Sequence, residues 1–428
     1  MSLLQRLPTG AFARQVAMLT TGTAAGQLVL VAVMPLLTRL YTPADLGVFG
    51  LFSSFLAVAG VATCLRLEWG VASAHSAEEA AGLLVLCLVL CPITSIVMSA
   101  GLAGMIGANV VSFGLLPMWT VPLGFLALVA TGAFAALRYW HIGRRDFRDV
   151  SAAAVAQGVG RAGTSVALGL AGTGWAGLLL GDLVGRVLGI GRLWRHALPV
   201  LRDRFDGDLR QALGARLRSA WRYPLIVLPS SLLDALAAAL PLPVIATLFG
   251  PAAAGQFALV WRVASVPASL IGASVADVFH AHAVTARAQG GGAVRHLLLR
   301  TASRLALLAT VIYVPVCVAA PFLFQWIFGR EWQASGWLML LLLPMWWAAA
   351  VVSPVSRLLV VMDRPALKFV FDLVFLLAPI ATMFALQDRG LNAAVFGYGM
   401  AACAAYAVYA ALLVIASADI RPVAPKGG

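Results

Sequence analysis

The chain has 428 residues, of which 61% are hydrophobic and 11% are charged, and its formal net charge is +13 at pH 7. Soluble domains carry roughly a quarter of their residues as charged side chains, so this composition excludes an ordinary soluble protein. Uncharged stretches longer than the roughly 20 residues that cross a bilayer occur at 80–137, 305–329 and 390–418. The sequence therefore predicts an all-α polytopic membrane protein.

Twelve transmembrane helices are predicted in chain order. Their expected ranges are 12–38, 45–72, 80–101, 113–138, 150–171, 174–195, 222–249, 252–281, 297–320, 333–357, 365–386 and 391–416. The fifth and sixth are the most polar, because Arg161, Asp182 and Arg186 interrupt them. The sixth also carries small residues at i, i+4 spacing, which lets helix backbones approach closely in lipid. These residues are Gly177, Gly181, Gly185 and Gly189.

Positive charge is distributed unevenly between the two sides of this arrangement. Most of the 30 Lys and Arg lie on the side of the N-terminus, whereas the loops on the other side hold Arg39, Arg330 and Arg389. Short loops rich in Lys and Arg stay in the cytoplasm. We therefore expect a multi-pass protein of the bacterial cytoplasmic membrane with both termini in the cytoplasm. Charge confined to such loops also argues against a nucleic-acid partner.

A short motif occurs twice, as "LTRLYTPADLGVFGL" at 37–51 and as "IATLFGPAAAGQFAL" at 245–259. The copies lie six spans apart, an even number, so they have the same orientation in the membrane. Such a parallel repeat predicts two six-helix lobes related by an axis along the membrane normal. The alternative is repeated turn chemistry alone. The expected divisions are an N-terminal lobe at 1–196, a basic cytoplasmic connector at 197–221, a C-terminal lobe at 222–416 and a cytoplasmic tail at 417–428.

Motifs for catalysis, nucleotides and metals are missing from the sequence. The two lysines, Lys368 and Lys426, complete no phosphate-binding loop. Two G-x-G-x-x-G matches, at 158–163 and 172–177, follow no predicted strand. The six histidines lack metal-site spacing, and the five cysteines, all in apolar segments, form neither a disulfide nor a zinc pattern. We therefore expect no enzymatic activity, no cofactor and no metal site.

Charged residues inside the predicted spans are the candidate functional groups, because charge in a bilayer usually faces a cavity or a partner. Asp182 and Arg186, spaced i, i+4, can neutralise each other. Asp234 and Arg262 either pair across two spans or line a water-filled cavity. A guanidinium in such a cavity suits a diphosphate, because its planar fork holds two oxygens at once. A desolvated carboxylate can titrate near neutral pH and couple transport to a proton or cation.

Several segments resemble the Wzx-type bacterial polysaccharide flippases, or O-antigen flippases, of the MOP exporter superfamily. They are "LLTRLYTPADLGVFGLFSS", "LRLEWGVASAHSAEEAAGL", "YWHIGRRDF", "FGPAAAGQFALVWRVASVPASLIGASVADVF" and "FGREWQASGWLMLLLLPMWW". In the family's L-R-Y-E motif, Leu67 replaces the aromatic residue here, while Arg66 and Glu68 are present. The resemblance implies two lobes and a cavity lined mainly by spans one, two, seven and eight.

The resemblance also implies a substrate. Wzx-type proteins move a polyprenyl-diphosphate-linked oligosaccharide from the inner to the outer leaflet for O-antigen, capsule or exopolysaccharide assembly. The expected partners are this lipid, bulk membrane lipids and other polysaccharide-assembly membrane proteins. The cationic candidates for the diphosphate and cavity are Arg262, Arg66, Arg161, Arg39 and Arg14. The candidates for ion coupling are Asp234, Glu68 and Asp372.

Three other functions compete with this hypothesis. A multidrug or cation antiporter of the related MATE branch should have an acidic site, whereas three arginines and two aspartates lie near mid-depth here. A peptidoglycan-precursor lipid flippase shares the expected cationic cavity. A membrane glycan polymerase or ligase usually needs a large outside loop with reactive groups, and the sequence predicts no such loop.

Overall fold

The computed structural model describes residues 9–74, 76–202, 220–356, 358–362 and 365–418, and every regular element in these ranges is helical. Within them, seven helices are each long and apolar enough to cross a membrane. A pair bent by 52°, Arg330–Leu341 with Leu343–Val355, adds an eighth. Each of the twelve predicted spans corresponds to one helix, to part of one, or to a broken pair. The chain is therefore an all-α multi-pass membrane protein, as its composition predicts.

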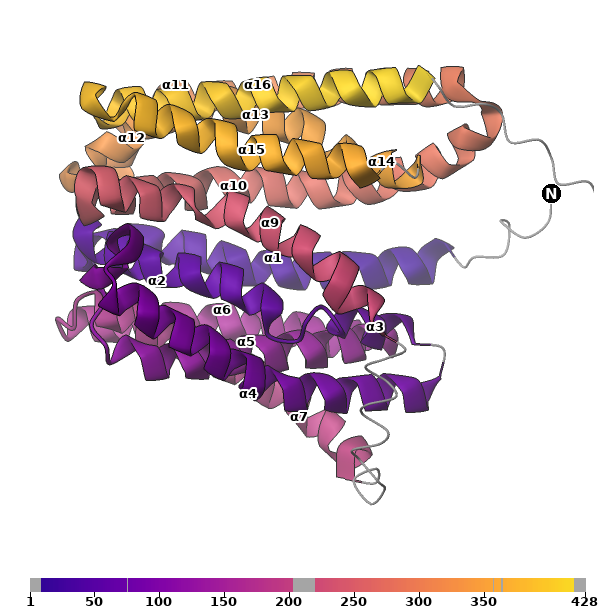
Figure 1. The fold of residues 1–428 in the computed structure, drawn as a ribbon, viewed down its shortest axis with the longest axis horizontal. Coiled ribbons are helices and arrows are strands. Elements are labelled where there is room, and N and C mark those ends of the chain that lie inside the picture. The colour runs from indigo at the N-terminus through magenta and orange to yellow at the C-terminus, as the bar shows by residue number, and fades with distance from the viewer. Residues whose placement is uncertain (1–8, 75, 203–219, 357, 363–364, 419–428) are drawn as a thin grey trace, which may run out of the picture. The chain divides into compact units, whose positions relative to one another are not determined.

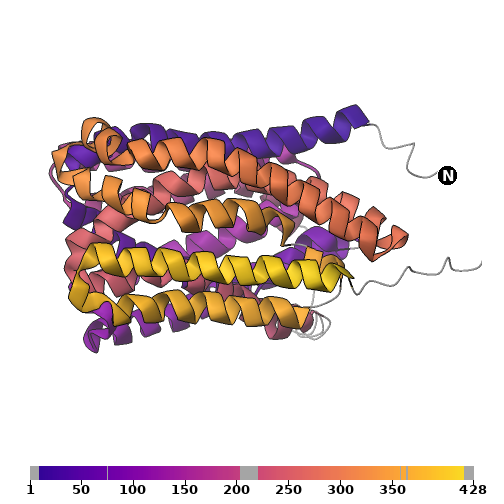
Figure 2. The same cartoon turned by 90° about the horizontal axis from the view of Figure 1, so that it is seen from above.

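Contacts within the chain divide it into two compact units, Met1–Thr247 and Leu248–Gly428. Most of the predicted connector at 197–221 lies outside the described residues, so the predicted lobe boundaries stay a prediction. The helices of each unit run lengthwise beside one another, and their ends meet in short corners (Figure 1). In the second unit, α15 and α16 lie side by side along their length in both views (Figure 2).

The first unit holds the helices that carry most of the candidate charges. Its elements are α1 (Thr9–Leu40), α2 (Pro43–Ala62), α3 (Glu68–Ser73), α4 (Ala77–Gly107), η2 (Val110–Leu115), α5 (Thr120–Gly143), α6 (Phe147–Leu170), α7 (Trp175–Arg202), η3 (Tyr223–Val227), α9 (Leu228–Ala239) and the start of α10 (Pro241–Gln289). The helices α6 and α7 are long enough to cross a bilayer. Their charged residues make them less apolar than the seven helices that qualify as spans by composition.

The second unit contains the rest of α10 and the helices that follow it. They are α11 (Gly291–Phe328), η4 (Arg330–Trp332), α12 (Gln333–Leu341), α13 (Leu343–Val352), η5 (Ser353–Val355), α14 (Leu358–Val361), α15 (Pro365–Ala385), η6 (Gln387–Arg389) and α16 (Leu391–Ala418). One side of α11 exposes Leu307, Val311 and Phe322. A surface of large apolar side chains is what a lipid-facing helix presents.

The glycine stripe of α7 is a packing surface, as its spacing predicts. A Cβ added at Gly181 would lie 2.2 Å from Ser165 Oγ, and one at Gly185 would lie 2.7 Å from the Gln157 carbonyl oxygen, both on α6. No side chain fits at either position, so the two backbones approach as closely as glycine permits. This close approach fixes the register between α6 and α7.

The first copy of the repeated motif forms the corner between α1 and α2. Thr42 is the N-cap of α2, and its hydroxyl accepts a hydrogen bond from the Asp45 backbone N–H. The Asp45 carboxylate accepts the Thr42 N–H in return, at 3.0 Å. Pro43 occupies the first turn, where its missing N–H costs nothing. This reciprocal capping satisfies two of the otherwise unpaired groups at the helix start.

The second copy breaks α10 at Gly250. Its φ of 85° and ψ of 169° lie in a region that side chains with a Cβ rarely adopt. Pro251 follows directly and starts the next helical stretch. The long element α10 is thus two helices joined by this corner, at the boundary predicted between spans seven and eight.

Candidate functional site

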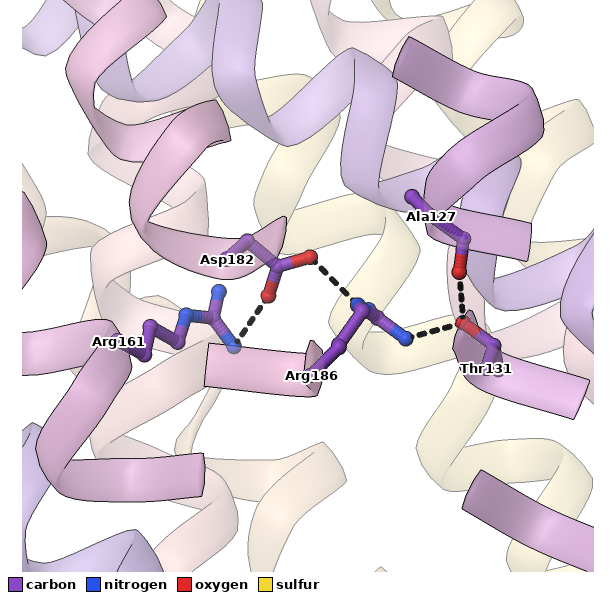
Figure 3. Close-up of polar contacts among 5 residues, drawn as sticks. All are labelled: Ala127, Thr131, Arg161, Asp182 and Arg186. Atoms are coloured by element: carbon purple, nitrogen blue, oxygen red, sulfur yellow. Dashed lines mark hydrogen bonds and ion pairs between the residues drawn. The ribbon is translucent and has the colours of Figure 1, made fainter. Parts of the chain in front are cut away.

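Three charged side chains form a buried cluster between α6 and α7 of the first unit. The Arg161 Nη1 atom lies 3.0 Å from one oxygen of Asp182, and the Arg186 Nε atom lies 2.8 Å from the other. Arg186 also donates to the Thr131 hydroxyl on α5, which in turn donates to the Ala127 carbonyl oxygen at 2.6 Å. Figure 3 shows the carboxylate of Asp182 between the two guanidinium groups. We call Arg161, Asp182 and Arg186 the arginine–aspartate triad.

The triad carries a net positive charge, because one carboxylate serves two guanidinium groups that cannot lose their protons. Asp182 is 4% exposed, whereas the two arginine side chains are 20–22% exposed. The Arg161 guanidinium also lies 5.6 Å from the centre of the Phe49 ring on α2, within the range of a cation–π contact. An excess charge held in a membrane-spanning unit favours an anionic ligand or an aqueous surface.

The predicted span two is not one continuous helix. The chain leaves the helical conformation after Ala62, and Leu65 and Arg66 have φ values of 52° and 62°, which are uncommon without glycine. The helix resumes as α3 at Glu68. No glycine or proline lies at this break, so no local signal predicts it.

Arg66 and Glu68 meet across this break. The Arg66 Nη1 atom lies 3.5 Å from Glu68 Oε1, and its guanidinium lies 5.2 Å from the centre of the Trp69 ring. Glu68 is 4% exposed, and its Oε2 atom has no hydrogen-bond partner in the described part of the chain. Burial raises the pKa of Glu68, although the nearby Arg66 opposes the shift.

The remaining predicted residues lie apart from the triad. Asp372 is buried on α15, and its Oδ2 atom lies 2.5 Å from Lys368 Nζ one turn earlier. Arg39 is exposed in the last turn of α1, where a cation complements the helix dipole. Asp234 is exposed on α9 of the first unit, and Arg262 is half-buried on α10 of the second. Both alternatives for these two residues, a pair across two spans or a water-filled cavity, stay predictions.

One predicted cation cannot be placed. Arg14 lies in the first half of α1, and its side chain is outside the part that the structure describes.

Sequence reasoning missed several polar partners that fix these helices. Asp45 accepts the Trp175 backbone N–H at 2.9 Å, which joins the start of α2 to the start of α7. In the second unit, Gln256 on α10 donates to the Glu331 carbonyl oxygen at 2.6 Å and accepts the Ser335 N–H at 3.0 Å. A Thr-x-x-Asp pattern could have identified the cap at Asp45. No local pattern signals the contacts of Gln256.

Comparison with known sequence families assigns the chain to one of them. A sequence model described as "polysaccharide biosynthesis protein" matches residues 36–336, which is most of the chain. The chain belongs to the polysaccharide biosynthesis protein family. Within this family member, the matched region includes the repeated motif, the triad and the Arg66–Glu68 break. A comparison with curated proteins finds no match.

Solved structures of MOP superfamily transporters have the same fold as this polysaccharide biosynthesis protein. The lipid II flippase MurJ in an inward closed conformation aligns with TM-score 0.70 and 11% identity, over 93% of this chain and 86% of that one. A mutant of the Vibrio cholerae MATE transporter VcmN gives 0.59 and 14%, over 96% and 97%. A Pyrococcus furiosus MOP transporter, described as having a binding pocket of reverse polarity, gives 0.54 and 16%, over 94% of each chain.

Proposed function

We propose that this protein is a flippase for a polyprenyl-diphosphate-linked oligosaccharide in surface polysaccharide assembly. It moves the repeat unit across the bacterial cytoplasmic membrane by alternating access through a cationic cavity. A charged headgroup cannot cross the hydrocarbon core without a shielded polar route. Membership of the polysaccharide biosynthesis protein family and the MOP fold support this proposal.

The net positive charge of the triad is the observation that carries the proposal. A diphosphate is a compact anion, and guanidinium groups bind its oxygens in pairs. Arg161 and Arg186 are both partly exposed, so they can contact an anion while Asp182 holds their orientation. In the proposed cycle, these arginines contact the diphosphate, and the sugars occupy the aqueous part of the route. Arg262 of the second unit is a further candidate for contact with the diphosphate.

A drug or cation antiporter is less well supported. A cation site needs a carboxylate whose charge is available to the ligand. In the described part of the chain, Asp182 is bound by two arginines and Asp372 by Lys368, so both carboxylates are already compensated. We propose that Asp182 and Asp372 are structural. Glu68 stays a candidate for ion coupling because only one of its oxygens lies near Arg66 and the other, Oε2, accepts no hydrogen bond in the described residues. Asp234 stays a candidate from its predicted depth in span seven.

The deciding experiment deletes the gene and analyses polyprenyl-diphosphate lipids by mass spectrometry. We expect one complete lipid-linked repeat unit to accumulate and the surface polymer to disappear. Accumulation of a peptidoglycan precursor instead would favour the peptidoglycan-precursor flippase. An unchanged lipid pool with intact polymer would contradict both flippase functions.

Arginine variants test the role of the cations. Arg161→Met leaves the neutral pair of Asp182 and Arg186 intact, so it removes the excess charge without exposing a buried carboxylate. At normal expression it should reduce surface polymer severalfold, as should Arg262→Ala. Arg192→Met is the matched control, because Arg192 is exposed beside Asp149. Full polymer levels in the Arg161 and Arg262 variants would contradict the proposed diphosphate contacts.

Cysteine labelling tests the proposed orientation. Ala252 and Gly292 are both exposed. Ala252 lies just after the break at Gly250, and Gly292 lies just after the end of α10, so the second part of α10 separates the two positions. A cysteine at position 252 should react with an impermeant thiol reagent on whole cells, whereas one at position 292 should react only after lysis. The reverse pattern would place both termini outside the cytoplasm.

A further inference from the structure

The first unit contains an apolar pocket of about 250 Å³ that the proposed headgroup route does not use. Its walls come from α2, α4, η2, α9 and the start of α10, and its exposed lining is entirely apolar. The residues that define its extent are Phe55, Met98, Met105, Phe113, Leu232 and Pro243. Because α2, α4 and the stretch formed by α9 and the start of α10 are three candidate membrane spans, hydrocarbon is the chemistry that suits this pocket.

Measured against the predicted spans, the pocket lies in one half of the membrane's depth. From Leu232 to Pro243 the lining covers twelve residues, or about 16 Å at the helical rise. That length is roughly half of the ~30 Å hydrocarbon core. Met105 lies two residues before the end of α4, next to η2, whereas Leu232 lies nearer the middle of its span. The pocket therefore extends from about mid-depth toward the η2 end, opposite the basic loops.

The element η2 covers the end of the pocket that lies farthest from mid-depth, beside the end of α4. Val111 and Phe113 contribute to the lining, and the Ser112 hydroxyl donates to Thr247 Oγ1 at 3.1 Å, one turn beyond Pro243. Val111 has a φ of 47°, which is unusual for a β-branched residue. Such strain persists where surrounding contacts over-determine the backbone, and it is concentrated at functional sites. A chain that follows the long axis of the pocket therefore enters from the mid-depth end.

From these observations we propose that the pocket binds the distal part of the polyprenyl chain while the diphosphate is on the cytoplasmic side. An ordinary lipid of the inner leaflet has a tail that ends near the midplane, about 15 Å deep. Its tail does not reach a pocket that begins at mid-depth. A polyprenyl chain is longer than one leaflet and passes the midplane. Chain length thus distinguishes the carrier lipid from the other lipids of the inner leaflet.

This inference rests on the proposed function, because it takes the carrier lipid as the substrate. In lipid surroundings no hydrophobic force drives a tail from bilayer to protein, and the gain comes from packing alone. The affinity gain should therefore be modest. The flexible side chains of Met98 and Met105 suit an irregular branched chain, since methionine adapts to gaps that rigid side chains leave.

The test is a titration of the purified full-length protein in detergent, followed by native mass spectrometry. The probes are undecaprenyl phosphate and farnesyl phosphate, which share the headgroup and differ in chain length. Met98→Trp and Ala239→Trp fill the pocket from opposite walls. Ala100→Trp is the control, because Ala100 is exposed on α4 and does not line the pocket.

We expect both filling variants to bind undecaprenyl phosphate roughly fivefold more weakly, as lost packing in lipid predicts, with farnesyl phosphate binding unchanged. Unchanged undecaprenyl phosphate binding would overturn the inference, as would equal weakening of both probes. A third probe, dioleoylphosphatidylglycerol, represents ordinary bilayer lipids. If the filling variants weakened the binding of this lipid only, the inference would also be overturned. Failure of the unsubstituted protein to bind either isoprenoid phosphate would instead contradict the proposed function. The chain-length difference therefore separates the two hypotheses.

Discussion

In the first unit, the corner that starts α2 is fixed by Thr42 and Asp45, whereas the matching corner in the second unit turns at Gly250. Proline follows the turn residue in both copies, as Pro43 and Pro251. Phe49 and Leu51 and their counterparts Phe257 and Leu259 are buried in both copies, whereas Thr42 in the first copy is replaced by Gly250 in the second. A shared corner can therefore be retained by packing while its local backbone chemistry changes.

The two units also differ in how they anchor the helix that follows the corner. Asp45 of the first unit binds the Trp175 N–H, so it uses a carboxylate at a half-buried position. The second unit uses the neutral side chain of Gln256, which is 8% exposed. The first unit additionally holds the triad, with two cations to one anion, whereas the pair of Lys368 and Asp372 in the second is balanced. The triad thus gives the first unit a partly buried excess of positive charge that the Lys368–Asp372 pair of the second unit lacks.

The largest predicted effect comes from Asp182→Ala. It leaves two guanidinium groups in the membrane-spanning unit without their counter-charge, and breaking a buried ion pair costs about 3–5 kcal/mol. The counterpart, Asp372→Ala, should cost about 1 kcal/mol, because the Lys368 side chain is 34% exposed and can reach water. The free energy of unfolding in mixed micelles, followed by tryptophan fluorescence, measures both.

A control removes the charge rather than the partner. The combined change of Asp182 to Asn, Arg161 to Met and Arg186 to Met should recover much of the stability lost in Asp182→Ala, since no buried ion remains unpaired. Equal losses in Asp182→Ala and Asp372→Ala would show that the charge difference between the units has no energetic consequence.

The next effect compares the two anchors. Gln256→Ala leaves the buried Ser335 N–H without its partner, which costs about 1–3 kcal/mol. It also removes the bond to the carbonyl oxygen of the exposed Glu331, where water can replace the amide, so a total near 2–3 kcal/mol is expected. Asp45→Ala should cost about 1 kcal/mol, because water can replace a half-buried partner. The same unfolding assay ranks them, and a larger loss for Asp45→Ala would reverse the comparison.

The corners themselves should differ in their tolerance of alanine. Gly250→Ala meets no steric clash, since no atom lies within 4 Å of the added Cβ, so its whole cost is backbone strain of about 1–3 kcal/mol. Thr42→Ala should cost about 1 kcal/mol through loss of the cap. Thr42→Gly should cost only a few tenths, since glycine is accepted at N-caps. If Gly250→Ala left the free energy of unfolding unchanged, this corner would have relaxed to a backbone conformation that residues with a Cβ also adopt.

The sequence predicted the spans and both corners because apolar length, proline and glycine leave local signals. It also predicted the pairing of Asp182 with Arg186, which follows from helical spacing. The third member, Arg161, was invisible as a partner because its contact depends on the register between α6 and α7. The glycine stripe indicated that these helices approach closely but not which residues would meet. The break before Glu68 left no signal, since ordinary residues occupy the unusual conformations there.

The smallest predicted effect concerns this break and tests whether Glu68 differs from a solvated carboxylate. Burial raises the pKa of Glu68, so the folded protein binds this proton more tightly than the unfolded chain does. Its contribution to stability is therefore full below the unfolded value of about 4.3 and is lost as the pH rises through the raised pKa. Replacing Glu68 with Gln removes this dependence.

The difference in unfolding free energy between the unsubstituted protein and Glu68→Gln should fall as the pH rises from about 4 toward neutrality, following the raised pKa. Glu78→Gln is the control, because Glu78 is exposed in the first turn of α4. Parallel pH profiles for the unsubstituted protein and Glu68→Gln would mean that Arg66 compensates the burial fully. Glu68 would then be a fixed ion-pair partner at all these pH values, and Asp234 would be left as the candidate for coupling transport to a proton.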